Sequence, residues 1–422
     1  MTRPLPPVRP AAAAAEPDLP ASPEHFLRPG TLRFAAPPPL ALYVHLPWCL
    51  KKCPYCDFNS HGTAGLDAAT QQRYVDALVA DLEASLPLVW GRRVVSVFIG
   101  GGTPSLFEPA VIDRLLAAVR ARLPLEPGCE VTLEANPGTF ERERFRAFRE
   151  AGVTRLSIGV QSFDDAALHA LGRVHDAAQA RAAVAEAAEA FETWNLDLMY
   201  ALPGQTPAQL AAELEVALSF QPPHLSIYHL TIEPNTLFAL QPPELPDDDL
   251  ASEMLDLIAE RTAATGLARY EVSAFAREGH RCLHNLNYWS FGDYLGIGAG
   301  AHGKLSFPER VLRQVRWREP ATYMARALEG RAVSNQHEPA RAELPLEFMM
   351  NALRLKDGFP LRLFAERTGL PVSAVLAPLQ RARERGLVDW RDEGTADEWV
   401  QPTPRGFDFL SDLTALFVPA RG

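Results

Sequence analysis

The sequence predicts an α/β protein built on a parallel sheet, followed by a small, mostly helical domain. From Leu40 to about residue 266, short apolar strands alternate six times with amphipathic helices. This alternation is typical of parallel sheets, whose strands are joined by crossover helices. Such units form either a full or partial (β/α) barrel or an open doubly wound sheet, and hydrophobic periodicity alone does not separate the two.

The strands are expected where apolar residues run almost without interruption, at 40–46, 94–102, 129–137, 153–162, 194–204 and 224–230. Between them, apolar residues recur at helical spacing, as Val75, Leu78 and Leu82 do within 66–86. Further helices are expected at 110–123, 140–152, up to about 191, 207–220 and 247–266. In either layout the chemistry belongs at the carboxyl ends of the strands.

After about residue 335 the pattern changes to short helices at 344–355, 361–370 and 372–386, a hairpin at 387–403 and a last helix at 404–417. Helices followed by a hairpin predict a small winged-helix-like domain. We therefore divide the chain into a tail (1–39), a barrel with its extension (40–335) and a C-terminal domain (336–422). The tail holds eleven of the 37 prolines and many alanines, a composition typical of disorder.

Composition excludes several classes of function. The net charge of −11 argues against nucleic acid as a partner, because phosphate binding needs a basic surface. The N-terminus lacks a secretory signal pattern, and no apolar run reaches the length of a transmembrane segment. Five cysteines, three of them crowded, do not fit a disulfide framework. A cytoplasmic protein with reduced thiols is expected.

The crowded cysteines are Cys49, Cys53 and Cys56, in the stretch WCLKKCPYCDF. Thiolates suit zinc, copper(I) or iron–sulfur clusters. A zinc site would need a fourth ligand, which His45 or His61 could supply. Three ligands on one loop can instead wrap one corner of a four-iron cluster and leave one iron open.

The C-x-x-x-C-x-x-C spacing, with Tyr55 before the third cysteine, resembles the signature of radical S-adenosylmethionine (SAM) proteins. The resemblance implies a [4Fe–4S] cluster on the three cysteines, with SAM chelating the open iron. It also implies a full or partial (β/α) barrel, in which the protein orients the cofactor and excludes water.

Other segments resemble the SAM contacts of one branch of that family, the oxygen-independent coproporphyrinogen III oxidases and their relatives. GGGTP follows the second strand, where glycines let a backbone approach a ligand closely. Taken singly, each polar residue fits a structural role as well as a ligand role. Together, the resemblance implies SAM binding by Tyr43, Tyr55, Gly101, Gly102, Thr103, Glu134, Gln161, Arg173 and Asp197.

Two functions occur in this branch: oxidative decarboxylation of coproporphyrinogen III, and chaperoning of heme to acceptor proteins. The oxidase carries a fourth cysteine two residues after the third, where this chain has Phe58, and it has an ordered N-terminal extension instead of a Pro/Ala tail. The segment HNLNYW at 284–289 matches the motif of the chaperone side. The resemblance thus favours a heme chaperone, with the oxidase as the alternative.

The same segment offers groups that suit heme. His284 supplies an imidazole, a common axial ligand of heme iron, and Tyr288 and Trp289 supply flat faces for a porphyrin. His302 and His45 are alternative ligands. The expected partners are heme, an acceptor protein and an electron donor such as flavodoxin or ferredoxin. Whether SAM is cleaved, and whether the protein is an enzyme, stays open at this point, as does the oligomeric state.

Overall fold

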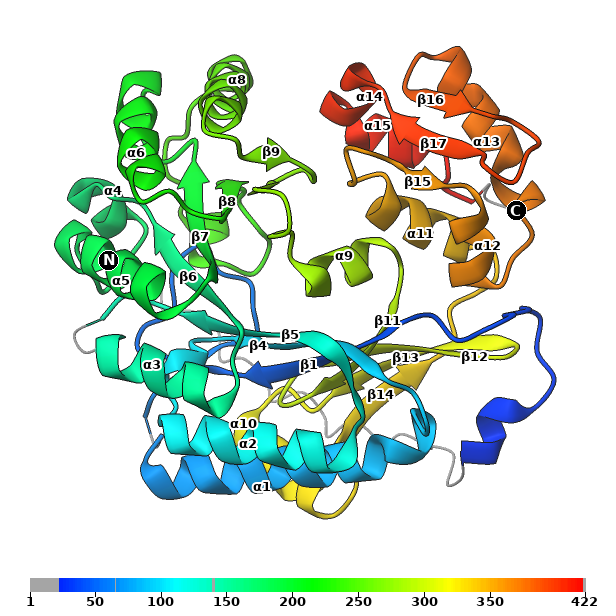
Figure 1. The fold of residues 1–422 in the computed structure, drawn as a ribbon, viewed down its shortest axis with the longest axis horizontal. Helices are drawn as coiled ribbons and strands as arrows, with labels where there is room; N and C mark the ends of the chain where they lie inside the picture. The colour runs from blue at the N-terminus through cyan, green and yellow to red at the C-terminus, as the bar shows by residue number, and fades with distance from the viewer. Residues whose placement is uncertain (1–22, 65, 139–140, 420–422) are drawn as a thin grey trace, which may run out of the picture.

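The computed structural model describes residues 23–64, 66–138 and 141–419, and its centre is a single twelve-stranded sheet (Figure 1). Six strands run parallel in chain order, as the alternation predicted. They are β1 (Leu40–Leu46), β4 (Val94–Gly101), β5 (Leu125–Ala135), β6 (Arg155–Gln161), β7 (Thr193–Tyr200) and β8 (His224–His229). Strand β1 shows why: six of its seven residues are buried, so its sequence LALYVHL is apolar on both faces.

The crossover helices lie on the outer face of these strands. Their sequential neighbours contact one another, α1 with α2, α2 with α3 and α3 with α5, which places them on one side of the sheet. One-sided helices distinguish a barrel from a doubly wound sheet. The helices are α1 (Ala68–Ser85), α2 (Pro109–Arg122), α3 (Glu141–Ala151), α4 (Asp165–Ala170), α5 (Ala177–Ala190), α6 (Pro207–Ser219), α7 (Leu237–Leu240) and α8 (Asp248–Ala264). The main core fills the space between these helices and the sheet.

The barrel is partial, because its two edges carry further strands instead of pairing with each other. Beyond β1 lie β11 (Asp293–Ile297), which is parallel to it, and then β12 (His302–Phe307), β13 (Arg310–Arg316) and β14 (Val333–His337), with α10 (Pro320–Leu328) alongside α1. Beyond β8 lie β10 (Ala274–Ala276) and β9 (Ala268–Arg269). Helix α9 (Leu283–Trp289), which carries HNLNYW, packs against β4 and β1.

The C-terminal domain has its own core and a small antiparallel sheet, in agreement with the expected helices and hairpin. Its elements are α11 (Leu344–Ala352), β15 (Phe359–Pro360), α12 (Arg362–Thr368), α13 (Ser373–Glu384), β16 (Val388–Arg391), β17 (Trp399–Pro402), α14 (Pro404–Asp408) and α15 (Leu410–Ala415). The single last helix expected at 404–417 is wrong. It breaks at Phe409, whose backbone (φ −104, ψ 45) is not helical.

Residues 23–39, which we name the N-terminal strap, correct the expectation of a disordered tail. After a short 3₁₀ helix (Pro23–Leu27), Phe26 stacks on Phe307 with ring centroids 5.1 Å apart. The backbone of Leu32 donates to Glu309 O (3.1 Å), and Leu32 is buried in the core of the C-terminal domain. Proline-rich composition excludes regular structure but not packing, because a stiff chain loses little entropy when it docks. Residues 1–22 lie outside the described residues.

Within the described part of the chain, no helix is both long and apolar enough to cross a bilayer. The N-terminal strap lines none of the three cavities described below.

Candidate functional site

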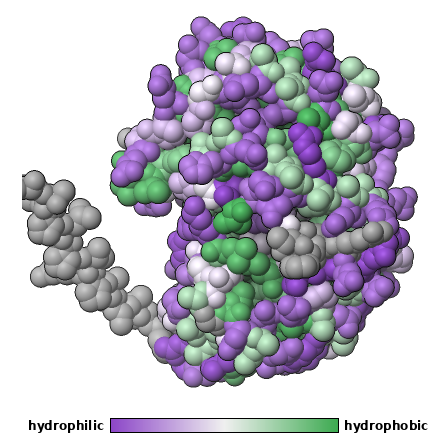
Figure 2. Space-filling model, turned by 90° about the vertical axis from the view of Figure 1, so that its left-hand side faces the viewer, coloured by the Kyte–Doolittle hydropathy of each residue, from purple (hydrophilic) through white to green (hydrophobic). Residues whose placement is uncertain are grey.

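The expected site residues gather at the carboxyl ends of the parallel strands. Strands β1 and β6 point toward the left-hand side of Figure 1, and Figure 2 shows that side, with apolar side chains across its middle. Large apolar side chains on loops at these strand ends are exposed, among them Leu50, Phe58 and Val174 at 61%, 61% and 55%. Three hollows lie among these loops and inside the partial barrel.

The cysteine loop is held at its base by two short parallel strands, β2 (Trp48–Cys49) and β3 (His61–Gly62). All three loop cysteines are free thiols of intermediate exposure. Thr103 Oγ1 lies 3.7 Å from Cys49 Sγ, and Arg173 Nη1 donates to Cys53 Sγ at 3.5 Å. Donors aimed at sulfur stabilise thiolates and tune a bound cluster.

The pKa shifts of the thiols show that they lie near one another. Burial raises the pKa of Cys49, and the neighbouring Cys56 and Cys53 raise it further, while the Thr103 hydroxyl lowers it. Burial likewise raises the pKa of Cys56, with a smaller contribution from Cys53. The Cys49 and Cys56 thiols are therefore costly to ionise without a cation, so the loop is suited to a positively charged iron centre.

The donor set fits a four-iron cluster better than zinc. Within the described residues, no three His, Cys, Asp or Glu side chains converge as they would around a single metal ion. A cubane takes each thiolate on a different iron and therefore needs them spaced apart. His45 is unsuitable as a fourth ligand, since its Nδ1 is bonded to Tyr43 Oη and its Nε2 to Asn59 O, both at 2.8 Å.

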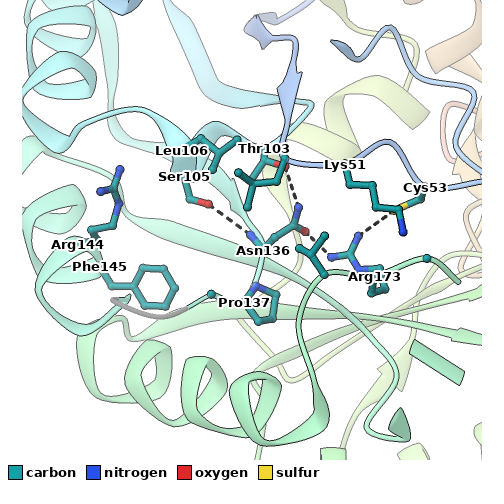
Figure 3. Close-up of a pocket in the computed structure, with 14 residues that line it drawn as sticks. Lys51, Cys53, Thr103, Ser105, Leu106, Asn136, Pro137, Arg144, Phe145 and Arg173 are labelled. Carbon is teal, nitrogen blue, oxygen red and sulfur yellow. Dashed lines mark hydrogen bonds between the residues drawn. The ribbon is translucent and has the colours of Figure 1, made fainter. Parts of the chain in front are cut away.

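Asn136, which the sequence analysis missed, connects the loops around the cysteines (Figure 3). Its Nδ2 donates to Thr103 Oγ1 (2.8 Å), and its Oδ1 accepts from Arg173 Nη2 (2.7 Å). The same Arg173 nitrogen also donates to Gly159 O at 2.6 Å. Asn136 therefore fixes the two side chains that reach the cysteine sulfurs. It lies two residues after Glu134, on the same face of the chain, and this spacing was the available signal.

The barrel cavity, with a volume of about 330 Å³, opens below the cysteine loop. Nearly all the residues for which the resemblance implies SAM binding line it, together with the three cysteines: Tyr55, Gly101, Gly102, Thr103, Glu134, Gln161, Arg173 and Asp197. Tyr43 is the exception: it lies beside Phe98 on the neighbouring strand and lines the adjacent cavity, together with Gly101 and Glu134.

Glu134 is placed by the glycine turn. Gly101 N donates to Glu134 Oε2 (3.0 Å), and Gly101 has φ +116, which a side chain rarely adopts. A Cβ there would lie 2.4 Å from the His45 ring, and one on Gly102 would lie 2.5 Å from Trp48 O. Burial raises the pKa of Glu134 to about 7, with nearby Asp197 as the second cause. Glycine is thus required for the close approach that positions this carboxyl.

Asp197 is a buried carboxyl whose hydrogen bonds are already made. Ser157 Oγ donates to its Oδ2 (3.1 Å) and Asn195 Nδ2 to its Oδ1 (2.9 Å). Burial raises its pKa, and these hydrogen bonds lower it. Its presence in a strand is therefore explained by partners as well as by a ligand. Gln161, at the end of β6, has φ +68, a strained conformation that holds its side chain at the cavity.

The helix cavity, with a volume of about 530 Å³, lies beside α9 and shares five lining residues with the barrel cavity: Phe58, Phe98, Gly101, Glu134 and Asn285. The expected heme residues His284, Tyr288 and Trp289 all line it, as do His45 and His302. Its size falls within the range of about 300–1,000 Å³ that is usual for ligand sites. Six of its sixteen lining residues are Tyr, Phe or Trp: Tyr43, Phe58, Phe98, Tyr288, Trp289 and Tyr294.

His284 is held rigidly in this cavity. Its Nδ1 is hydrogen bonded to Ser96 Oγ (3.2 Å), and its ring packs on Phe98 with centroids 4.8 Å apart. Its Nε2 has no hydrogen-bond partner among the described residues. Burial lowers the pKa of His284 to about 3, which keeps the imidazole neutral and able to ligate a metal. Tyr288 is 44% exposed, so the cavity is accessible from solvent.

Polar residues at the floor of the barrel cavity were also missed by the sequence analysis. They include Thr132, Arg155, His224, Tyr228 and Cys282. Thr132 lies two residues before Glu134 on β5, and Arg155 lies six residues before Gln161 on β6, so both fall on the cavity-lining face, because alternate residues of a strand share a face. The alternation along the strands therefore indicated these residues, but they were overlooked because the barrel interior was expected to be apolar.

The fold and the cysteine loop define a class: a radical SAM protein. A family model described as the Radical SAM superfamily matches residues 43–217, and one described as the HemN C-terminal domain matches residues 340–409. The chain belongs to the family of proteins named heme chaperone HemW. The Escherichia coli (strain K12) member is 45% identical over 383 residues, which cover 90% of this chain and 98% of the relative.

More distant relatives agree with this assignment. The HemW of Mycobacterium tuberculosis (strain H37Rv) is 37% identical over 362 residues, 84% of this chain and 90% of the relative. The solved structure of coproporphyrinogen III oxidase (HemN) from Escherichia coli, a radical SAM enzyme, aligns with a TM-score of 0.74 at 24% identity over 90% of each chain. This similarity confirms the fold. Family membership implies a [4Fe–4S] cluster and SAM, and the residues around the cysteine loop fit both.

Proposed function

We propose that this protein is a heme chaperone, which holds one heme in the helix cavity and transfers it to an acceptor protein. The observation that carries the proposal is the cavity itself: aromatic side chains line it, and one buried imidazole faces it with Nε2 free of hydrogen bonds. Aromatic faces and a neutral imidazole are what a porphyrin and its iron require. The relatives named heme chaperone HemW support the same function.

His284 is the proposed axial ligand because the alternatives are less suitable. Both nitrogens of His45 are hydrogen bonded within the fold, so iron binding would break one of these bonds. His302 is exposed on β12 and has no hydrogen bond that would orient its ring, within the described residues. His284 combines an oriented ring with a free nitrogen, as metal-binding histidines usually do.

The arrangement also suits release of the heme. Tyr288 is half exposed on one turn of α9, and its ring rests against Tyr294 with centroids 5.1 Å apart. A single protein ligand and an accessible face let an acceptor compete for the iron from the open side. Chaperoning requires such exchange, whereas a permanent cofactor site would enclose the heme.

The experiment is a heme titration of the anaerobically reconstituted protein. Wild type is expected to bind about one heme per chain with a shift of the Soret band. His284→Ala should move or weaken that band, while His302→Ala, the matched control, should leave it unchanged. Loss of the band in His302→Ala with retention in His284→Ala would reassign the ligand, and no saturable binding by wild type would reject the function.

The cluster and SAM are proposed to bind at the cysteine loop and the upper barrel cavity. Cys49, Cys53 and Cys56 would hold the cluster, and the glycine turn with Glu134, Asp197 and the other lining residues would hold SAM. When bound, the cluster supplies an electron to SAM in this family. The residues of this chain orient the cofactor: Arg173 donates to the sulfur of Cys53, Thr103 donates to that of Cys49, and the Gly101 N–H fixes Glu134.

An electron donor would reach the cluster through the outer groove, a hollow of about 260 Å³ lined by Leu50, Lys51, Cys53 and Val174 among others (Figure 3). Cys53 lines both this groove and the barrel cavity, so the cysteine loop is the wall between them. We further propose a cytoplasmic location, where the free thiols stay reduced. To test this route, the rate at which reduced flavodoxin reduces the cluster is measured. Lys51→Glu is expected to slow that reduction.

A further inference from the structure

The floor of the barrel cavity carries two side chains that none of the assignments above uses. Thr132 of β5 and Arg155 of β6 are paired in the parallel register, so they lie side by side. Each is 1% exposed, and both line the cavity. Arg155 is the first residue of β6, and Thr132 lies three residues before the carboxyl end of β5, one cavity-facing position below Glu134.

Both side chains have an atom without a partner. Arg155 Nη1 donates to His280 O (3.0 Å) and lies 3.6 Å from Glu130 Oε2, but Nη2 is buried without any hydrogen bond. Thr132 Oγ1 is also buried without one. Leaving such a donor unsatisfied costs about 1–3 kcal/mol, so it indicates a group that a ligand completes.

The neighbouring polar groups are, by contrast, fully used. His224 Nδ1 is hydrogen bonded to Asn195 Oδ1 (2.6 Å), and His224 Nε2 is hydrogen bonded to Tyr270 Oη (2.7 Å). Ser226 Oγ donates to the same Asn195 oxygen at 3.0 Å. The hydrogen bonds around the floor therefore leave Arg155 Nη2 and the Thr132 hydroxyl, at paired positions of two neighbouring strands, as buried donors without a partner among the described residues.

We propose that Arg155 and Thr132 form a subsite for a carboxylate of the bound ligand. The proposal rests on the heme function above, for which that carboxylate is one propionate of the porphyrin. A guanidinium and a hydroxyl side by side offer charge-assisted hydrogen bonds to one carboxylate, which are among the strongest that proteins make. The subsite thus fixes the orientation of the ligand in the cavity.

The subsite is connected to the helix that carries the iron ligand. Glu130 Oε1 accepts the backbone N–H of His284 at 3.1 Å, while its Oε2 faces Arg155. Asn285, the next residue on α9, lines both the barrel cavity and the helix cavity. A porphyrin bound to His284 can therefore direct one edge past Asn285 to the floor.

Arg155 faces two acids near the floor, Glu130 at 3.6 Å and Asp197. Burial raises the pKa of Asp197, which favours its neutral form, while the charge of Arg155 lowers that pKa, and both oxygens of Asp197 already accept hydrogen bonds from Ser157 and Asn195. Glu134, higher in the cavity, is the remaining acid facing it. Arg318, exposed at the helix cavity, offers a second cation for the other propionate.

The test uses metal-free protoporphyrin IX and its dimethyl ester, whose binding does not depend on an iron ligand. Wild type is expected to bind the free acid at least tenfold more tightly than the ester. Arg155→Gln should weaken binding of the acid by about tenfold or more and leave the ester unchanged. Thr132→Val should weaken binding of the free acid about fivefold. Because the Thr132 hydroxyl has no hydrogen-bond partner, this substitution should not lower the stability of the fold.

Thr132→Val keeps the test decisive if Arg155→Gln does not fold. The subsite is refuted if acid and ester bind equally to wild type, or if both variants weaken the two ligands alike. Heme binding through His284 with no such dependence would leave the chaperone function intact and reject the subsite. Dependence on Arg155 and Thr132 without any ligation of iron by His284 would reassign the iron ligand and retain the subsite, whereas porphyrin binding that depends on both residues with no saturable binding of heme would reject the function and retain the subsite.

Discussion

Replacing Glu134 by Gln is predicted to stabilise the protein while impairing its use of SAM. Burial and Asp197 raise the pKa of Glu134 from 4.5 to about 7. An acid with a raised pKa destabilises the fold only where the unfolded chain is ionised. The penalty is thus absent below pH 4.5, grows between pH 4.5 and 7, and is complete above pH 7. A shift of about 2.5 units corresponds to about 3 kcal/mol at pH 8 and about 1 kcal/mol at pH 5.5.

The assay is urea unfolding of the reconstituted, SAM-free protein at both pH values under anaerobic conditions. Glu134→Gln keeps an oxygen that accepts the Gly101 N–H, so geometry is preserved while the charge is removed. Glu215→Gln, on the exposed face of α6, is the matched control and should change nothing. The reasoning would be refuted if Glu134→Gln did not raise the unfolding free energy, or if it raised it equally at pH 8 and pH 5.5.

The same carboxyl predicts the pH dependence of SAM binding. If Glu134 binds the ribose hydroxyls as an ionised acceptor, wild-type affinity for SAM should fall as the pH drops below about 7. Glu134→Gln should bind SAM more weakly and with little pH dependence. Isothermal titration across pH 6–8.5 separates the two variants.

Four further outcomes are expected. Alanine at any of the three loop cysteines should abolish the broad iron–sulfur absorbance, whereas Cys129→Ala and Cys282→Ala should keep it; full iron in the triple variant would contradict the cluster assignment. SAM added to the reduced protein should perturb the paramagnetic resonance spectrum, and an unchanged spectrum would indicate a fourth protein ligand, with His61 first to be tested. The gene should not rescue an oxidase-deficient strain under anaerobic growth; robust rescue would favour the oxidase. Phe26→Ala should lower the unfolding free energy by about 3 kcal/mol, against little change for the exposed Leu27→Ala.

The parallel strands were predictable because their central residues are buried on both faces, most clearly in β1 and β6, so that short apolar runs alternate with helices of clear periodicity. The break at Phe409 was not, since the sequence PRGFDFLSDLTALF supports one helix locally. Tertiary contact decides it: Gly406 approaches Leu387 O so closely that a Cβ there would lie 1.8 Å from it. Contacts between distant segments leave little trace in local periodicity.

The site was predictable where chemistry is encoded in spacing, as in the cysteine loop and the glycine turn. The site was less predictable where a residue matters because of the position that the fold gives it. Asn136 is unremarkable in sequence but bridges Thr103 and Arg173. Arg155 begins a strand, and only the fold shows that its side chain turns inward to a cavity. Tyr43, expected among the SAM residues, lines the helix cavity with Gly101 and Glu134 and does not line the barrel cavity, where the other expected residues lie.

The N-terminal strap has a consequence for biosynthesis. Its docking positions at Glu309 and Gly369 are translated long after the strap itself, when most of the barrel has already emerged. Until then, Phe26 and Leu32 have no partner surface and must be shielded from aggregation by holding factors or by transient collapse. Docking is therefore a late event that joins the last-made domain to the sheet. A ribosome that stops before residue 369 would release a chain whose barrel strands are complete but whose apolar strap stays exposed, a ready target for proteolytic quality control.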